Sequence, residues 1–172
     1  PGLHRRDQGL LRHISPPHRR APCHRDARLE ALLEERARRS KIKHILDVEK
    51  SLGALRQAAI EQRCISYGEL AAVNEVAWSQ AHHRMNGANG HLDRLLDVCH
   101  ARGLPMLPAI CVNKQGLATG ELEAPALAGF AEGARRLGFS VTDELAFHRQ
   151  CRDECWEWGR QQQSASVSYT HL

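Results

Sequence analysis

Apolar side chains recur at steps of three and four residues along much of this chain, a spacing typical of helices that bury one face. Four such stripes predict four helices, and the second ends at Gly103 and the third at Gly138, as a glycine C-cap would. The stripes are Ile42, Ile45, Val48, Leu52, Leu55 and Ala59; Leu92, Leu95, Leu96 and Cys99; Leu127, Phe130, Ala134 and Leu137; and Phe147, Cys151, Cys155 and Trp158. A shorter basic and acidic helix is expected around Leu29, Leu32 and Leu33.

A further short helix is predicted by the polar residues at its start. Ser66 and Glu69 have the spacing of a capping box, in which the hydroxyl and the carboxylate each bind a backbone N–H of the other residue. The helix is therefore expected from Tyr67 to about Val73. The next segment, Trp78 to Gly90, is polar and interrupted by two glycines.

A strand and a turn are predicted later in the chain. Met106 to Val112 is an apolar run, Asn113 to Gly116 is a turn, and Leu117 to Leu122 can return as a second strand. The predicted fold is therefore α+β and mostly helical. It is a winged helix-turn-helix-like core, with a two-stranded wing at Leu104–Leu122 and extra packing helices.

Charge divides the chain unevenly. Residues 1–44 hold 12 Lys and Arg against 5 Asp and Glu, a net charge of +7, whereas residues 45–172 hold 12 against 15, a net charge of −3. We expect residues 1–43 to be a basic extension, either disordered or not native to the protein, and residues 44–160 to form the domain. Residues 161–172 are expected to be a disordered tail, and its end resembles translated cloning-adapter sequence.

Composition adds few constraints on function. No apolar run approaches the roughly 20 residues that a membrane span requires, and no apolar segment near the N-terminus marks secretion. The six cysteines form no CxxC pair, a pattern that favours reduced thiols in a cytoplasmic protein. The acidic balance of residues 45–172 weakens a nucleic-acid interpretation, since phosphate contacts supply much of that affinity.

The segment from Cys64 to Gly116 resembles the DNA-binding domain of alkylguanine DNA alkyltransferases and of their catalytically inactive alkyltransferase-like relatives. The resemblance rests on Ser66-Tyr67-Gly68-Glu69-Leu70-Ala71 and on Asn113-Lys114-Gln115-Gly116. It implies that the first segment opens a helix-turn-helix, that Asn89 to about Arg102 is the recognition helix, and that the second segment is the wing.

The reactive segment of that family has no match. Counted back from Asn113, the position of the nucleophile is Pro108, and Cys111 is offset by three residues. Alkyl transfer is therefore not supported. The arginine finger of the family has Arg84 and Arg94 as candidates.

A second resemblance covers His44 to Gly159 and concerns a group of uncharacterised small bacterial and phage proteins. The shared segments are Tyr67–Ala71, Gly103–Leu107, Val112–Lys114 and Gly129–Gly138. This likeness supports the fold and implies no activity.

Candidate nucleic-acid contacts gather around the proposed recognition helix. Asn can pair with adenine, Arg with guanine or phosphate, and a helix N-terminus favours phosphate. The expected contacts are Tyr67, Arg84, Asn86, Asn89, His91, Arg94 and Lys114. Caps and a solvated surface explain the same residues, and both interpretations remain open. His82 and His83 are candidates for metal ligands or acid–base groups, but adjacent residues on a helix face different directions and would not hold one ion together. A solvated surface is preferred for them, with a phosphate or base contact second.

A metal site is the weaker chemical hypothesis. His148, Cys151 and Cys155 share one helix face, and histidine with thiolate suits zinc. The two cysteines also lie on the apolar stripe, where free cysteine packs as a small hydrophobe, so packing is the preferred interpretation. No metal or other cofactor is therefore expected.

The function predicted from the sequence is a non-enzymatic module that binds duplex DNA, without a catalytic residue. The alternative is a protein-interaction or adaptor domain on the same scaffold, which the net charge of −3 favours. A zinc-binding enzyme is the weakest hypothesis. No membrane partner is expected.

Overall fold

The computed structural model describes residues 24–43 and 45–168. The chain divides after Lys41 into two units, each described here by itself. The first contains most of helix α1 (His24–Lys43), whose leucines Leu29, Leu32 and Leu33 are 55–61% exposed. The predicted short helix is confirmed, and it is longer than the leucines suggested.

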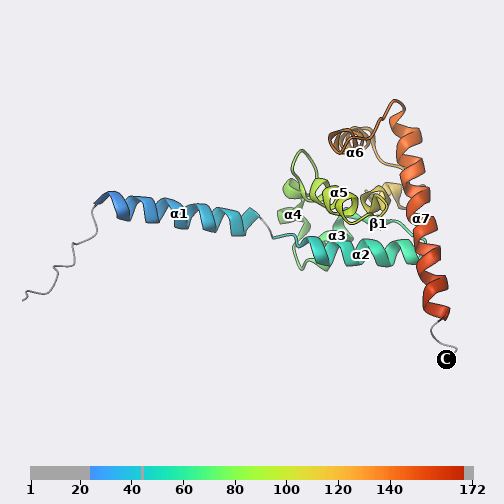
Figure 1. Ribbon diagram of the computed structural model, residues 1–172, viewed down its shortest axis with the longest axis horizontal. Helices are drawn as coiled ribbons and strands as arrows, with labels where there is room; N and C mark the ends of the chain where they lie inside the picture. Colours follow the sequence, from blue (N-terminus) through green and yellow to red (C-terminus); the bar gives the residue numbers. More distant parts are fainter. Residues whose placement is uncertain (1–23, 44, 169–172) are drawn as a thin grey trace, which may run out of the picture. The chain divides into compact units, whose positions relative to one another are not determined.

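The second unit is mostly helical and holds a two-stranded sheet, as predicted (Figure 1). Its elements in chain order are α2 (Val48–Ile60), β1 (Ile65–Ser66), α3 (Tyr67–Val73), α4 (Trp78–Met85), α5 (His91–Ala101), the 3₁₀ helix η1 (Leu107–Ile110), β2 (Cys111–Val112), the 3₁₀ helix η2 (Gln115–Leu117), α6 (Ala124–Arg136) and α7 (Glu144–Ser168). Residues 161–168 are thus helical, where a disordered tail was predicted. The predictions for residues 1–23 and 169–172 lie outside the described residues.

Helix α2 begins later than its apolar stripe suggested. Asp47 caps it by accepting a hydrogen bond from the backbone N–H of Lys50 at 2.9 Å, so the helix starts at Val48 instead of near Ile42. Leu52 and Leu55 lie fully inside the core.

Helices α2 and α7 cross at a glycine. A Cβ at Gly159 would stand 2.1 Å from the carbonyl oxygen of Ala59, so only glycine allows this approach. Gln62 reinforces the crossing, because its side-chain amide donates to the carbonyl oxygens of Ala59 at 2.7 Å and of Trp156 at 2.9 Å. The long helix α7 also packs against η1 and α6.

The sheet differs from the predicted wing. β1 pairs with β2 in parallel, with Ile65 opposite Cys111 and Ser66 opposite Val112. Residues 117–122 form no strand, and η1 replaces most of the predicted strand before β2. The two-stranded wing at Leu104–Leu122 was therefore wrong. The side chain of Asn113 accepts from the N–H of Gly116 at 2.7 Å, which turns the chain into η2 instead of a hairpin.

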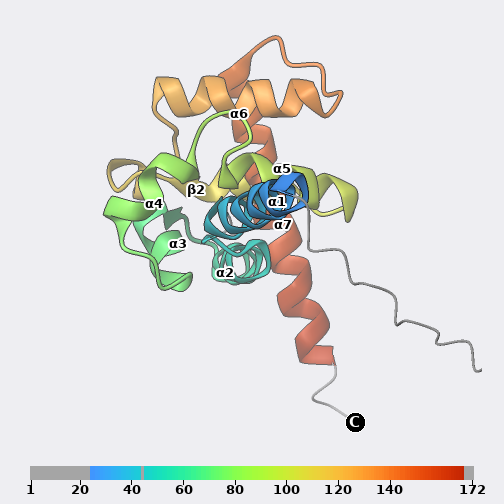
Figure 2. The same cartoon turned by 90° about the vertical axis from the view of Figure 1, so that its left-hand side faces the viewer.

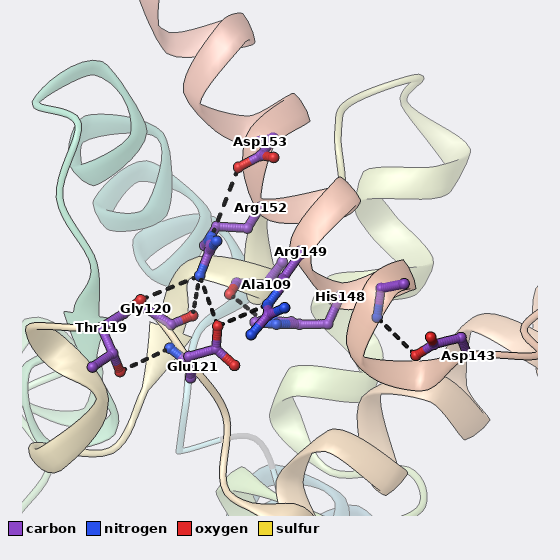
Figure 3. Close-up of polar contacts among 10 residues, drawn as sticks. Ala109, Thr119, Gly120, Glu121, Asp143, His148, Arg149, Arg152 and Asp153 are labelled. Carbon is purple, nitrogen blue, oxygen red and sulfur yellow. Dashed lines mark hydrogen bonds and ion pairs between the residues drawn. The ribbon is translucent and has the colours of Figure 1, made fainter.

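The loop after η2 is held by arginines of α7 (Figure 3). Arg152 donates to the carbonyl oxygens of Thr119 at 3.2 Å and Gly120 at 3.1 Å, and Arg149 pairs with Glu121 at 2.9 Å. This loop thus follows α7 closely without being part of a sheet.

A buried polar network joins α2, α3 and α5. The side-chain amide of Asn74 donates to the hydroxyl of Ser51 at 2.8 Å and to the carbonyl oxygen of Leu70 at 2.9 Å. The same hydroxyl lies 2.6 Å from Nε2 of His91. Ser51 and His91 are fully buried, so this network belongs to the core.

Candidate nucleic-acid interface

Helices α3 and α4 pack against each other across a short turn. The predicted capping box starts α3: the hydroxyl of Ser66 accepts from the N–H of Glu69 at 3.1 Å, and the Glu69 carboxylate accepts from the N–H of Ser66 at 2.7 Å. β1 ends at the capping residue itself. The position of α3 is therefore set by a local cap and by pairing with β2.

Four residues separate α3 from α4, which is the turn length of a helix-turn-helix. Asn74 is buried and tied to α2 through Ser51. Glu75 follows with φ of 58°, a left-handed conformation that reverses the chain sharply. The N–H of Val76 then bonds the carbonyl oxygen of Ala71 at 3.1 Å, which closes the turn.

Helix α4 presents most of its side chains to solvent. Only two of its side chains, Ala81 and Met85, are buried. The exposed ones are Trp78, Ser79, Gln80, His82 and His83. The chain has no acidic residue between Glu75 and Asp93. The solvent face of α4 therefore combines polar groups, imidazoles and one large ring without negative charge.

Aromatic and imidazole rings form a row beside this face. Tyr67 and Trp78 are nearly parallel, with centroids 6.4 Å apart. The ring of His82 lies 5.9 Å from Trp78 and 3.6 Å from His83. Trp78 is 44% exposed, so the row is open to a ligand that can stack or accept hydrogen bonds.

Helix α5, the predicted recognition helix, is covered instead. His91, Leu95, Leu96 and Cys99 are buried. α6 lies beside α5 (Figures 1 and 2) and its Arg136 pairs with Asp97 at 2.8 Å. The prediction placed base contacts on a helix whose sides are occupied by neighbouring helices.

His91 shows this correction most clearly. Its exposed fraction is 0%, and within the described residues its Nδ1 has no hydrogen-bond partner. Burial lowers the pKa of His91 to about 4, with the charge of Arg94 adding to the effect and that of Asp47 opposing it. His91 is therefore a neutral core residue and not a DNA contact.

The other expected contacts are distributed over two cavities and a loop. Tyr67 and Lys114 line a cavity of about 350 Å³ together with Trp78. Tyr67 also lines a second cavity, which Asn86 borders. Asn89 is exposed in the turn before α5, and its backbone N–H donates to Asp93 at 3.0 Å.

The two arginines are less accessible than predicted. Arg84 and Arg94 are half-buried, and both are engaged in interactions within the protein. Nε of Arg94 is out of contact with solvent. Trp78, Ser79 and Gln80 are exposed on α4 and were not among the expected contacts. The signal that could have singled them out is the absence of acidic residues beside a four-residue turn.

The three metal candidates have other roles in the core. Nε2 of His148 lies 2.8 Å from the carbonyl oxygen of Ala109, to which it donates, and the thiol of Cys155 donates to Met106 at 3.3 Å (Figure 3 shows His148). Cys151 is buried, and burial raises the pKa of its thiol to about 12. Among the side chains that the structure describes, no three of His, Cys, Asp or Glu are arranged to hold a metal ion.

Cys111 has no features of a nucleophile. It is buried at the start of β2, and burial raises the pKa of its thiol far above the usual range.

Comparisons of the chain with protein-family models, with curated proteins and with solved structures find no match. The resemblance to alkylguanine DNA alkyltransferases thus stays a prediction. Among the described helices, none is both long and apolar enough to cross a membrane.

Proposed function

We propose that this chain is a non-enzymatic DNA-binding module in which α3 and α4 form the helix-turn-helix and α4 enters the major groove. The observation that carries the proposal is the solvent face of α4, which holds polar and imidazole groups and no acidic side chain. A recognition helix needs such a face, because carboxylates would be repelled by phosphates.

The surroundings of α4 support the same assignment. Gln80 offers an amide that can pair with adenine, and the histidines can donate to base edges or phosphates. Lys114 is exposed and lines the same cavity as Trp78, so it stands where a phosphate contact would extend the surface of α4. The Asn113–Leu122 loop then takes the place of a wing without being a hairpin.

Affinity for duplex DNA tests the proposal in the full chain. Binding to a labelled mixed-sequence duplex should weaken as salt rises, with a logarithmic slope of magnitude about 3–5 for a few phosphate contacts. His83→Glu on α4 should weaken binding about tenfold, since one good contact is worth roughly 1–3 kcal/mol.

His100→Glu is the matched control, because it introduces the same charge at an exposed histidine of α5. This variant should change the affinity for DNA less than twofold, because salt screens a surface charge that lies away from the DNA. An equal loss of DNA affinity in both variants would mean that binding depends on the overall charge, with the basic segment 1–44 supplying the contacts. No loss in either would remove α4 from the interface.

A protein-interaction domain is the second candidate, and a separate observation favours it. Val73 and Trp78 are 42% and 44% exposed at the two ends of the α3–α4 turn. An exposed tryptophan commonly anchors a protein partner, and an apolar neighbour such as Val73 extends the apolar surface around it. If the full chain does not bind DNA at low salt, this candidate becomes the better one.

A further inference from the structure

An apolar cavity shares Tyr67 with the cavity that Trp78 and Lys114 line. It encloses about 380 Å³ between the start of α3, α5, η1 and α6. Apolar side chains form most of its wall, from Leu92 and Leu96 on α5 to Phe130 on α6. A volume of this size lies within the range of small-molecule sites in proteins.

Two glycines of α6 shape the cavity in different ways. At Gly133 a Cβ would stand 2.8 Å from Cδ1 of Leu96, so this glycine lets α6 approach α5 closely. At Gly129, one turn earlier, a Cβ would meet no heavy atom within 4 Å. Gly129 lines the cavity, so the missing side chain leaves space that the fold does not fill.

The charged groups of the wall are already paired. Arg136 contacts the carboxylates of Asp93 at 3.8 Å and Asp97 at 2.8 Å, and Glu132 lies 3.6 Å from Arg135. An ionised ligand would therefore find no unpaired opposite charge among these side chains.

The remaining polar groups of the wall are neutral. Burial raises the pKa of both the Tyr67 hydroxyl and the Cys111 thiol, which keeps each protonated at neutral pH. Asn86, whose amide is uncharged, also borders this cavity.

We propose that this cavity binds an uncharged apolar small molecule. Water placed there would find few polar partners, whereas an apolar ligand would bury its surface against Leu92, Leu96 and Phe130. The inference is independent of DNA binding, because it rests on the cavity alone.

The test uses N-phenyl-1-naphthylamine, an uncharged dye that fluoresces in apolar surroundings, with the full chain. The wild-type chain should bind the dye saturably at one site. Gly129→Leu should fill the cavity and weaken binding at least about tenfold. Gly53→Leu is the matched control, because Gly53 is another exposed helical glycine with nothing within 4 Å, and it lies on α2 away from the cavity.

Two results would overturn the proposal. One is the absence of saturable dye binding by the wild-type chain. The other is equal binding by all three chains, which would place the dye on other apolar surface such as the exposed leucines of α1. Circular dichroism checks that each variant folds, and if Gly129→Leu does not, Ala126→Leu fills the cavity from the preceding turn of α6.

Discussion

Helices α4 and α5 follow each other along the chain, yet α4 is mostly exposed and α5 is mostly covered. α4 buries two side chains and presents Trp78, Gln80 and His83 to solvent. α5 buries four and is flanked by α2, α6 and η1. Both are amphipathic, and both contain histidine and arginine, so their sequences alone make either one a plausible recognition helix. The comparison teaches that the helices packed around a segment decide whether its polar residues can reach a partner.

Truncating a buried leucine should give the largest difference between the two helices. Leu95→Ala on α5 should lower the free energy of unfolding by about 2–5 kcal/mol, because it removes a fully buried side chain and leaves a cavity. Trp78→Ala on α4 should cost less than about 1 kcal/mol, since much of the ring is already in water. Urea unfolding followed by circular dichroism measures both. A loss at Trp78 equal to that at Leu95 would mean that α4 is part of the core.

Acid should have the next largest effect, because protonation of His91 on α5 lowers the free energy of unfolding. The pKa of His91 is lowered to about 4 in the folded chain, against an ordinary 6.5, so the folded state favours the neutral ring. Its contribution to stability is complete above pH 6.5 and is lost as the pH falls from 6.5 to 4, by about 3 kcal/mol in total.

The burial of His148, which also lowers the pKa of that residue, adds to this loss in the same direction. Unfolding in urea at a series of pH values should show the decline, and His91→Gln should make the decline smaller. An unchanged pH profile in His91→Gln would show that His91 is not buried as a neutral ring.

Replacing the glycine at the α5–α6 contact should have an intermediate effect. Gly133→Val should destabilise the chain by about 1–3 kcal/mol, because its side chain overlaps Leu96 and Asp93. Gly129→Val, the same change one turn earlier, meets open space and should cost less than about 0.5 kcal/mol. Thermal melts of the pair measure the difference, and equal melting temperatures would show that α6 does not cover α5.

The ion pairs between α5 and α6 should contribute least. Arg136→Met removes the contacts to Asp93 and Asp97 but keeps an apolar side chain of similar length. Because the arginine is about 41% exposed, the expected loss is below about 1 kcal/mol and should shrink further in high salt. A larger loss that salt does not reduce would indicate that packing, and not charge, joins the helices there.

The wrong predictions share one cause, because each depended on a contact between residues that are far apart in the sequence. The hairpin was expected because Asn113 to Gly116 has turn residues next to an apolar run, and the turn is indeed present. The partner of that run is Ile65–Ser66, far away in the sequence, and no local pattern specifies a parallel pairing of that kind. His91 was assigned to the surface for a similar reason, because its hydrogen-bond partner Ser51 lies on another helix.

The sequence by itself determined where several helices begin and end. The capping box of Ser66 and Glu69 forms as predicted, and Gly103 and Gly138 adopt the positive φ that follows a helix end. These features depend on residues within one turn of each other, so the local sequence is sufficient. The tertiary structure alone decided that α4 is exposed, that α5 is covered, and that Cys151 and Cys155 pack in the core. Burial depends on contacts between segments distant in sequence, and local periodicity specifies only that a helix has an apolar face, not which neighbours cover the rest.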